Sequence, residues 1–253
     1  MSLPLIRPTN REGLLVWVLH RFAEEFNEHA ILKGGLLLRL LDSPRYTNDV
    51  DIVFAPYRSK RQITPRVRAI LEEIEDAAVD VSHHSTMLRA TIRVDGVAVQ
   101  VECSVASECR SIAMTTASMA EANGYLPRVV RAMDLSVALA HKLAAWNERR
   151  VVRDLYDAYF FVARVGVRPD MRVLEERLRT FRSNRPELKR VRSMTVVVFK
   201  SSLEEALANL TDRAIDEELS GLIPASVRAG LCLQIRAALN GLLQSFPSRA
   251  STR

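Results

Sequence analysis

The sequence has few glycines and cysteines and no long hydrophobic run, and each scarcity excludes a class of protein. None of its nine glycines forms a GxGxxG or GxxxxGK pattern, which excludes the usual dinucleotide and P-loop phosphate sites. The three cysteines are odd in number and lack CxxC spacing, which argues against a disulfide framework or a cysteine zinc site. No apolar run reaches the roughly 18 residues of a membrane span, and no basic-then-apolar signal pattern opens the chain. We therefore expect a cytoplasmic protein with no membrane partner.

The positive charge is concentrated in the second half of the chain. The 253 residues have a formal net charge of +6, to which residues 1–130 contribute −1 and residues 131–253 contribute +7. Ten basic residues lie between residues 164 and 192, against four acidic ones. Such a cluster can bind a phosphate backbone by releasing condensed counterions, and it can equally be a solvated helix face with local ion pairs. Charge alone leaves both interpretations open.

Hydrophobic periodicity predicts an α+β fold. Helical spacing of apolar residues predicts helices over residues 11–26, 36–41 and 64–77, and alternation predicts a strand over residues 49–54. Residues 87–94 and 97–105 flank Asp95-Gly96, a dipeptide typical of β-hairpin turns. Later segments are mostly helical, at residues 135–146, 153–163, 171–182, 201–209 and 226–243. The β-branched run at residues 194–200 fits either a buried strand or a helix.

These patterns divide the chain into three parts. Residues 1–130 are expected to form a mixed sheet with helices, and residues 131–244 a mostly α-helical domain with a basic surface. Residues 245–253 are expected to be a disordered tail.

Two aspartates share one face of a predicted strand. Asp49 and Asp51 are two residues apart, so their side chains point the same way. Carboxylates at this spacing, about 7 Å, repel each other unless a cation lies between them, and Mg²⁺ is the simplest such cation. The alternative is an edge strand with both aspartates in solvent, which is the favoured interpretation of an isolated Asp-x-Asp.

Two nearby features favour the metal-binding interpretation. Gly34 and Gly35 follow Lys33 at a strand–helix junction, where adjacent glycines let backbone N–H groups approach a phosphate. Glu102 lies between apolar neighbours on the later hairpin strand, where a carboxylate is costly unless it is paired or bound to a metal. Three acidic groups on adjacent strands beside a glycine turn form the arrangement expected for two-metal phosphoryl transfer.

The helix that begins near residue 135 has basic residues in its apolar stripe. If the helix is continuous, Lys142, Arg149 and Arg153 lie in the same arc as its apolar residues. One interpretation is a buried ion-pair network in which Asp154 or Asp157 neutralises the arginines. The other is that Lys142 reaches a nucleoside triphosphate while one of these aspartates holds it in place. The spacing alone does not decide between them.

Taken in order, these segments resemble the AbiEii family of nucleotidyltransferase toxins, within the DNA polymerase β-like superfamily. ILKGG at residues 31–35 and RYTNDVD at residues 45–51 resemble the first family motif. HKLAA at residues 141–145 and RDLYD at residues 153–157 resemble the downstream helical motifs. Leu36 stands where the family often has Ser or Thr, and Glu102 where the third acid is often Asp.

The resemblance implies a toxin that transfers a nucleotide from an NTP to RNA with Mg²⁺, at the tRNA 3′ end, and so blocks translation. Asp49 and Asp51 would bind the metal ions, Glu102 would be the third ligand or the base, and Lys142 and Asp154 would complete the catalytic site. Residues 1–130 would be the nucleotidyltransferase core, the basic half would hold the RNA, and a cognate antitoxin would be a further partner. The NTP-binding residues would be Lys33, Gly34, Gly35, Arg45, Thr47 and Lys142.

Two alternatives remain open at this level. The same chemistry could act on a protein or small-molecule hydroxyl. The chain could also be a non-catalytic module that retains the fold and binds nucleic acid or an antitoxin.

Overall fold

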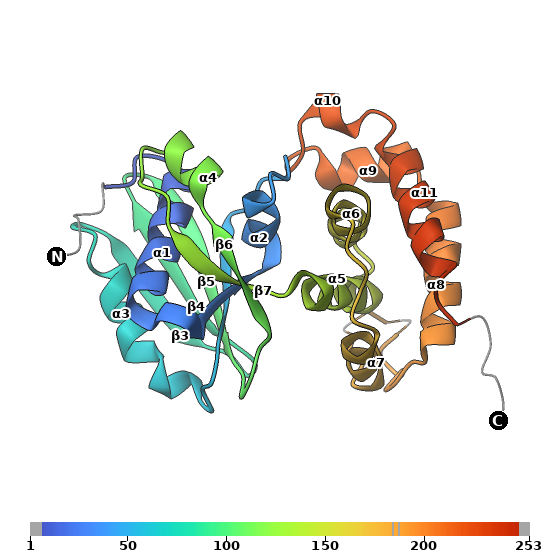
Figure 1. The fold of residues 1–253 in the computed structure, drawn as a ribbon, viewed down its shortest axis with the longest axis horizontal. Coiled ribbons are helices and arrows are strands. Elements are labelled where there is room, and N and C mark those ends of the chain that lie inside the picture. The colour runs from blue at the N-terminus through green and yellow to red at the C-terminus, as the bar shows by residue number, and fades with distance from the viewer. Residues whose placement is uncertain (1–6, 184, 187, 248–253) are drawn as a thin grey trace. The chain divides into compact units, whose positions relative to one another are not determined.

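The structure, a computed structural model, describes residues 7–183, 185–186 and 188–247. It consists of two compact units, Met1–Asp134 and Leu135–Arg253, which run from blue to green and from yellow-green to red in Figure 1. The division lies close to residue 130, where the sequence patterns change. Most of the tail expected at residues 245–253 lies outside the described residues.

The first unit is built on a seven-stranded mixed sheet with the strand order β3-β4-β5-β2-β1-β7-β6. The pairs β2–β5 and β1–β7 are parallel, and the other neighbouring pairs are antiparallel. The central strand is therefore β2, the strand that bears the two aspartates. The strands are β1 (Ala30–Lys33), β2 (Asp49–Phe54), β3 (Ala78–His83), β4 (Leu88–Val94), β5 (Val97–Val105), β6 (Ser111–Thr115) and β7 (Val129–Met133).

Helix α1 (Arg11–Phe26) packs against the sheet, as Figure 1 shows. The side chain of Asn10 caps it by accepting the N–H of Gly13 at 2.8 Å. Leu14, Val18 and Phe22 recur at helical spacing and are buried, as the periodicity predicts. Three further helices belong to this unit, namely α2 (Gly34–Leu40), α3 (Thr64–Leu71) and α4 (Ala117–Ala122).

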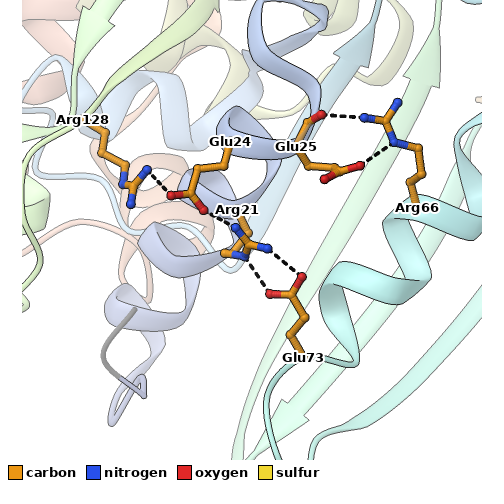
Figure 2. Close-up of polar contacts among 6 residues, drawn as sticks. All are labelled: Arg21, Glu24, Glu25, Arg66, Glu73 and Arg128. Atoms are coloured by element: carbon orange, nitrogen blue, oxygen red, sulfur yellow. Dashed lines mark hydrogen bonds and ion pairs between the residues drawn. The ribbon is translucent and has the colours of Figure 1, made fainter. Parts of the chain in front are cut away.

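Ion pairs connect α1 to α3 and to neighbouring segments, as Figure 2 shows. Arg21 Nη2 lies 2.7 Å from Glu73 Oε1, and Arg66 Nε lies 2.7 Å from Glu25 Oε1. These side chains are partly exposed, and exposed pairs contribute about 0–1 kcal/mol each, so they orient α1 more than they stabilise it. The residues drawn are Arg21, Glu24, Glu25, Arg66, Glu73 and Arg128.

The hairpin predicted at Asp95-Gly96 is confirmed. Strands β4 and β5 pair in an antiparallel register on either side of it, and both turn residues have positive φ, 50° and 78°. Positive φ at both central residues is the turn geometry that Asp-Gly favours. This tight turn fixes the register of the two strands as far as Arg89, which lies opposite Glu102.

The second unit is helical wherever the structure describes regular secondary structure in it. Its core includes Trp146 and Phe199, whose ring centroids are 5.9 Å apart. Across the described part of the chain, no helix combines the length and apolar character needed to cross a bilayer. The elements are α5 (Leu135–Arg149), α6 (Val152–Tyr159), a π-helical segment (Phe160–Val165), α7 (Met171–Arg179), α8 (Val196–Asn209), α9 (Asp212–Leu219), α10 (Ala225–Arg228) and α11 (Leu231–Leu243).

The run at residues 194–200, which fits a strand or a helix by sequence, begins helix α8. The hydroxyl of Thr195 accepts the N–H of Val198 at 3.3 Å and so caps the helix. Val196, Phe199 and Leu203 are buried at helical spacing. This periodicity appears only when the run is joined to residues 201–209, which is why the shorter window is ambiguous.

Candidate active site

The strand register brings Asp49, Asp51 and Glu102 to one face of the sheet. In the parallel pair β2–β5, Asp51 lies opposite Glu102, and Asp49 lies opposite Gln100. Val50, between the two aspartates, faces the other way and is 0% exposed. The aspartates therefore share a face, as their spacing predicts, and the register adds a third carboxylate beside Asp51.

The backbone of the glycine pair lies directly against the candidate site. Gly34 has a φ of +74°, and a Cβ added there would lie 1.9 Å from Oδ2 of Asp51. A Cβ on Gly35 would lie 2.4 Å from Nη2 of Arg45 and 2.9 Å from Oγ1 of Thr47. Only glycine lets the main chain approach these three side chains so closely, and at residue 34 only glycine adopts the required φ without strain.

Arg45 and Thr47 are held in the segment between α2 and β2. The side chain of Arg45 is buried, and its Nη1 donates to the carbonyl of the next residue at 3.3 Å. Oγ1 of Thr47 accepts the N–H of Asp49 at 3.3 Å, which holds the hydroxyl at the start of β2. Lys33 lies opposite Asp51 in the β1–β2 register. The predicted nucleotide-binding residues of this unit therefore gather where β1 ends and β2 begins.

Glu102 is paired with a basic residue that the sequence analysis did not identify. Its Oε1 accepts hydrogen bonds from Nη2 and Nε of Arg89, at 2.8 and 3.2 Å, and from Nε2 of Gln100 at 2.8 Å. Within the described residues, its Oε2 accepts none. The expectation of an apolar environment was wrong because the apolar neighbours of Glu102 face the opposite side of the strand. Counting back from the Asp95-Gly96 turn would have found Arg89, since the hairpin register pairs it with Glu102.

The donor atoms at this face suit a hard cation. Carboxylate oxygens such as those of Asp49 and Asp51 are preferred by Mg²⁺, which is commonly bound by one or two carboxylates together with substrate phosphates. In residues 7–183 and the other described segments, no group of three His, Cys, Asp or Glu side chains is arranged to hold a metal. The chemistry of the two aspartates fits such a cation, and the metal-binding roles of Asp49, Asp51 and Glu102 stay predictions.

Lys142 and Asp154 each belong to an ion pair in the second unit. Nζ of Lys142 lies 2.5 Å from Oδ2 of Asp157. Arg149 donates to both oxygens of Asp154, from Nη2 at 2.7 Å and from Nε at 3.0 Å. Both aspartates are 0% exposed. Of the ion-pair network that the spacing allowed, the structure contains the pair of Arg149 with Asp154, whereas Asp157 pairs with Lys142 and the described contacts include no ion pair of Arg153.

The contacts of Asp154 give it a local structural role. Burial raises the pKa of its carboxyl group, whereas the charges of Arg149 and Lys142 oppose that rise. With both oxygens bound by Arg149 and no exposed surface, Asp154 positions that guanidinium. The catalytic roles expected for Lys142 and Asp154 stay predictions, since the contacts described for them lie within the helical unit.

Both the sequence and the fold are similar to those of known proteins. A family model described as "Nucleotidyl transferase AbiEii toxin, Type IV TA system" matches residues 17–229. The structure of MenT4, a nucleotidyltransferase toxin from Mycobacterium tuberculosis H37Rv, is similar with a TM-score of 0.60 at 16% identity, covering 94% of this chain and 85% of that chain. The crystal structure of JHP933 from Helicobacter pylori gives a TM-score of 0.50 at 12% identity, covering 92% and 90%. No curated protein sequence matches the chain. At these identities, the two structures show a shared fold.

Proposed function

Since the chain belongs to the AbiEii family of nucleotidyltransferase toxins of type IV toxin–antitoxin systems, we propose that it transfers a nucleotide from an NTP to the 3′ end of tRNA and so blocks translation. The proposal includes Mg²⁺ as the cofactor, the cytoplasm as the location and direct binding of a cognate antitoxin. One observation supports the site assignment above the others. The backbone of Gly34 lies against the Asp51 carboxylate, on the face that also bears Asp49 and Glu102.

Different residues of the first unit would bind the metal ion and the phosphates of the nucleotide. Asp49 and Asp51 would hold Mg²⁺, and the metal would supply positive charge that neutralises the triphosphate and the leaving pyrophosphate. Backbone N–H groups of Gly34 and Gly35 donate to phosphate oxygens, as the close approach of the main chain allows. Arg45, whose guanidinium lies beside Gly35, adds positive charge next to the same phosphates.

The reaction is an in-line displacement at the α-phosphorus of the NTP. The acceptor hydroxyl oxygen forms a bond to that phosphorus, the bond from it to the α,β-bridging oxygen breaks, and pyrophosphate leaves with the electron pair. Oε2 of Glu102 would accept the hydroxyl proton or complete the metal coordination, a role supported by the fact that Oε1 is the oxygen bound by Arg89 and Gln100. Lys142 would neutralise the triphosphate, a role that rests on the family resemblance.

The charge distribution supports RNA as the acceptor. The metal-binding face lies in a half of the chain that is nearly neutral, and the helical half has a net charge of +7. A positively charged surface attracts a phosphate backbone at long range and in a salt-dependent way. A protein or small-molecule hydroxyl would draw no comparable benefit from this asymmetry.

Transfer of label tests the proposal. The purified chain is incubated with total tRNA, Mg²⁺ and each of the α-labelled NTPs, and RNA and protein are separated before counting. We expect label in RNA, and its loss in Asp49→Asn and Asp51→Asn but not in the matched control Asp80→Asn, whose residue is exposed on the edge strand β3. Label in protein alone would support the protein-acceptor alternative. Label that survives both Asp49→Asn and Asp51→Asn would contradict the site assignment.

A further inference from the structure

The helical unit contains a cavity of about 640 Å³ beside the end of α5. Of the lining residues that the structure describes, three are arginines and one is acidic, so this part of the lining is cationic. The lining residues are Glu148, Arg149, Arg182, Ser183, Arg185 and Pro186.

Arg149 is fixed in place from the protein interior. Its Nε and Nη2 donate to Oδ2 and Oδ1 of the buried Asp154, at 3.0 and 2.7 Å. Its side chain is nevertheless 49% exposed, so part of the guanidinium remains available at the cavity wall. An arginine held by a buried carboxylate loses less conformational freedom when a ligand binds, and its planar fork suits phosphate oxygens.

Hydrogen bonds connect the lining residues of the segment after α7 to the end of α5. Ser183 Oγ donates to the carbonyl of Glu148 at 2.5 Å and accepts the N–H of Arg185 at 3.2 Å. Nη1 of Arg185 donates to the carbonyl of Arg149 at 3.1 Å. These contacts keep the positively charged groups around one space.

The charges of the lining do not cancel one another. Among the described lining residues the acidic one is Glu148, which is paired with Arg177 at 3.0 Å, and Arg149 is paired with Asp154. Arg182 is exposed and has no ion-pair partner among the described residues. A cationic cavity with one preorganised arginine and one unneutralised arginine is suited to an anion with several oxygens.

We propose that this cavity binds a backbone phosphate of the acceptor RNA, with Arg149 and Arg182 as its principal ligands. The inference rests on the proposed function, because the acceptor there is an RNA. In this proposal Asp154 positions Arg149 at the phosphate. The competing occupant is an acidic protein segment, such as one of an antitoxin.

Salt-dependent RNA affinity tests the proposal. Fluorescence anisotropy with labelled tRNA is measured over a range of salt for the wild-type chain, Arg182→Gln and the control Arg213→Gln. Arg213 is an exposed arginine of the same unit that is paired with Glu217 and does not line the cavity. For Arg182→Gln we expect a loss of affinity on the order of tenfold and a salt slope smaller by about one. For Arg213→Gln we expect neither change.

Several outcomes separate this inference from the proposed function. If the chain transfers label to RNA but Arg182→Gln binds tRNA as tightly as the wild type does, the RNA-binding role of the cavity is wrong and the proposed function still holds. If RNA binds tightly and this binding depends on Arg182, but no nucleotide is transferred, the RNA-binding role of the cavity is supported and the proposed function is wrong. Equal losses for Arg182→Gln and Arg213→Gln would show diffuse electrostatics and overturn the inference. If Arg182→Gln weakens binding of poly-glutamate but leaves RNA binding unchanged, the inference is wrong and the occupant of the cavity is an acidic protein segment.

Asp154→Asn adds a readout for positioning. This variant keeps the shape of the side chain but removes the charge that holds Arg149. We expect its RNA affinity to fall in the same direction as that of Arg182→Gln. A folded Asp154→Asn variant with wild-type RNA affinity would overturn the positioning of Arg149 at the phosphate.

Discussion

The carboxylate of Asp51 occupies the space in which any side chain at residue 34 would begin. A Cβ on Gly34 would lie 1.9 Å from Oδ2 of Asp51 and 2.7 Å from its Cγ. Gly34 begins helix α2 directly after β1, and Asp51 lies on β2, which pairs with β1 in an antiparallel register. The close approach therefore depends on both residues, and it brings the main chain at residue 34 against the carboxylate that we propose as a metal ligand.

Gly34→Ala is expected to abolish transfer and to destabilise the first unit. Its matched control is Gly96→Ala, because Gly96 has a similar φ of +78° and no heavy atom within 4 Å of its Cβ position. Gly96→Ala should cost about 1 kcal/mol of unfolding free energy from backbone strain alone and leave transfer intact. Urea unfolding and label transfer measure both effects. Equal behaviour of the two variants would contradict the contact with Asp51.

Glu102→Gln is expected to lower kcat about 100-fold or more if Glu102 accepts the hydroxyl proton. Arg89→Gln breaks the same ion pair, in which the Arg89 and Glu102 side chains are 39% and 20% exposed. Such a pair stabilises the fold by about 1 kcal/mol or less, so Arg89→Gln should change kcat far less. Steady-state kinetics and urea unfolding are measured on both variants. Equal losses of kcat would assign Glu102 a structural role.

His20 is expected to make the first unit less stable in mild acid. It is fully buried, with Nε2 2.8 Å from Oγ1 of Thr116, and burial, aided by the charge of Arg128, lowers its pKa from 6.5 to about 4. Between these values the unfolded chain binds a proton that the folded chain does not, so stability falls as the pH falls through this window. The full effect is about 3 kcal/mol.

Urea unfolding of His20→Gln tests this pH dependence. At about pH 4.5 the variant should lose less of its pH 7.5 stability than the wild-type chain, because the shifted titration is removed. His84→Gln, at an exposed histidine, is the control and should lose as much as the wild type. Identical pH profiles for wild type and His20→Gln would contradict a buried neutral imidazole at position 20.

Local patterns in the sequence were enough to predict the α+β class, the hairpin and the shared face of Asp49 and Asp51. They could not reveal the partner of Glu102 without the strand register, although the turn at Asp95-Gly96 encodes that register. Strand β7 was not predicted because it is short and pairs with β1 across about 100 residues of chain, a contact that no local pattern specifies. The ion pairs of Asp154 and Asp157 were among the alternatives considered, but helical spacing could not say which basic residue each aspartate binds.

Lys142 is expected to have a structural and a nucleotide-binding role, and a double variant separates them. Lys142→Met leaves the fully buried Asp157 without its ammonium partner, which should cost about 3–5 kcal/mol of unfolding free energy. Loss of transfer in that variant is therefore ambiguous. Lys142→Met with Asp157→Leu removes both charges and should recover much of the stability. If Lys142 neutralises the triphosphate, the folded double variant stays inactive, with weakened NTP binding by calorimetry. Recovery of transfer together with stability would show that Lys142 serves only the helical core.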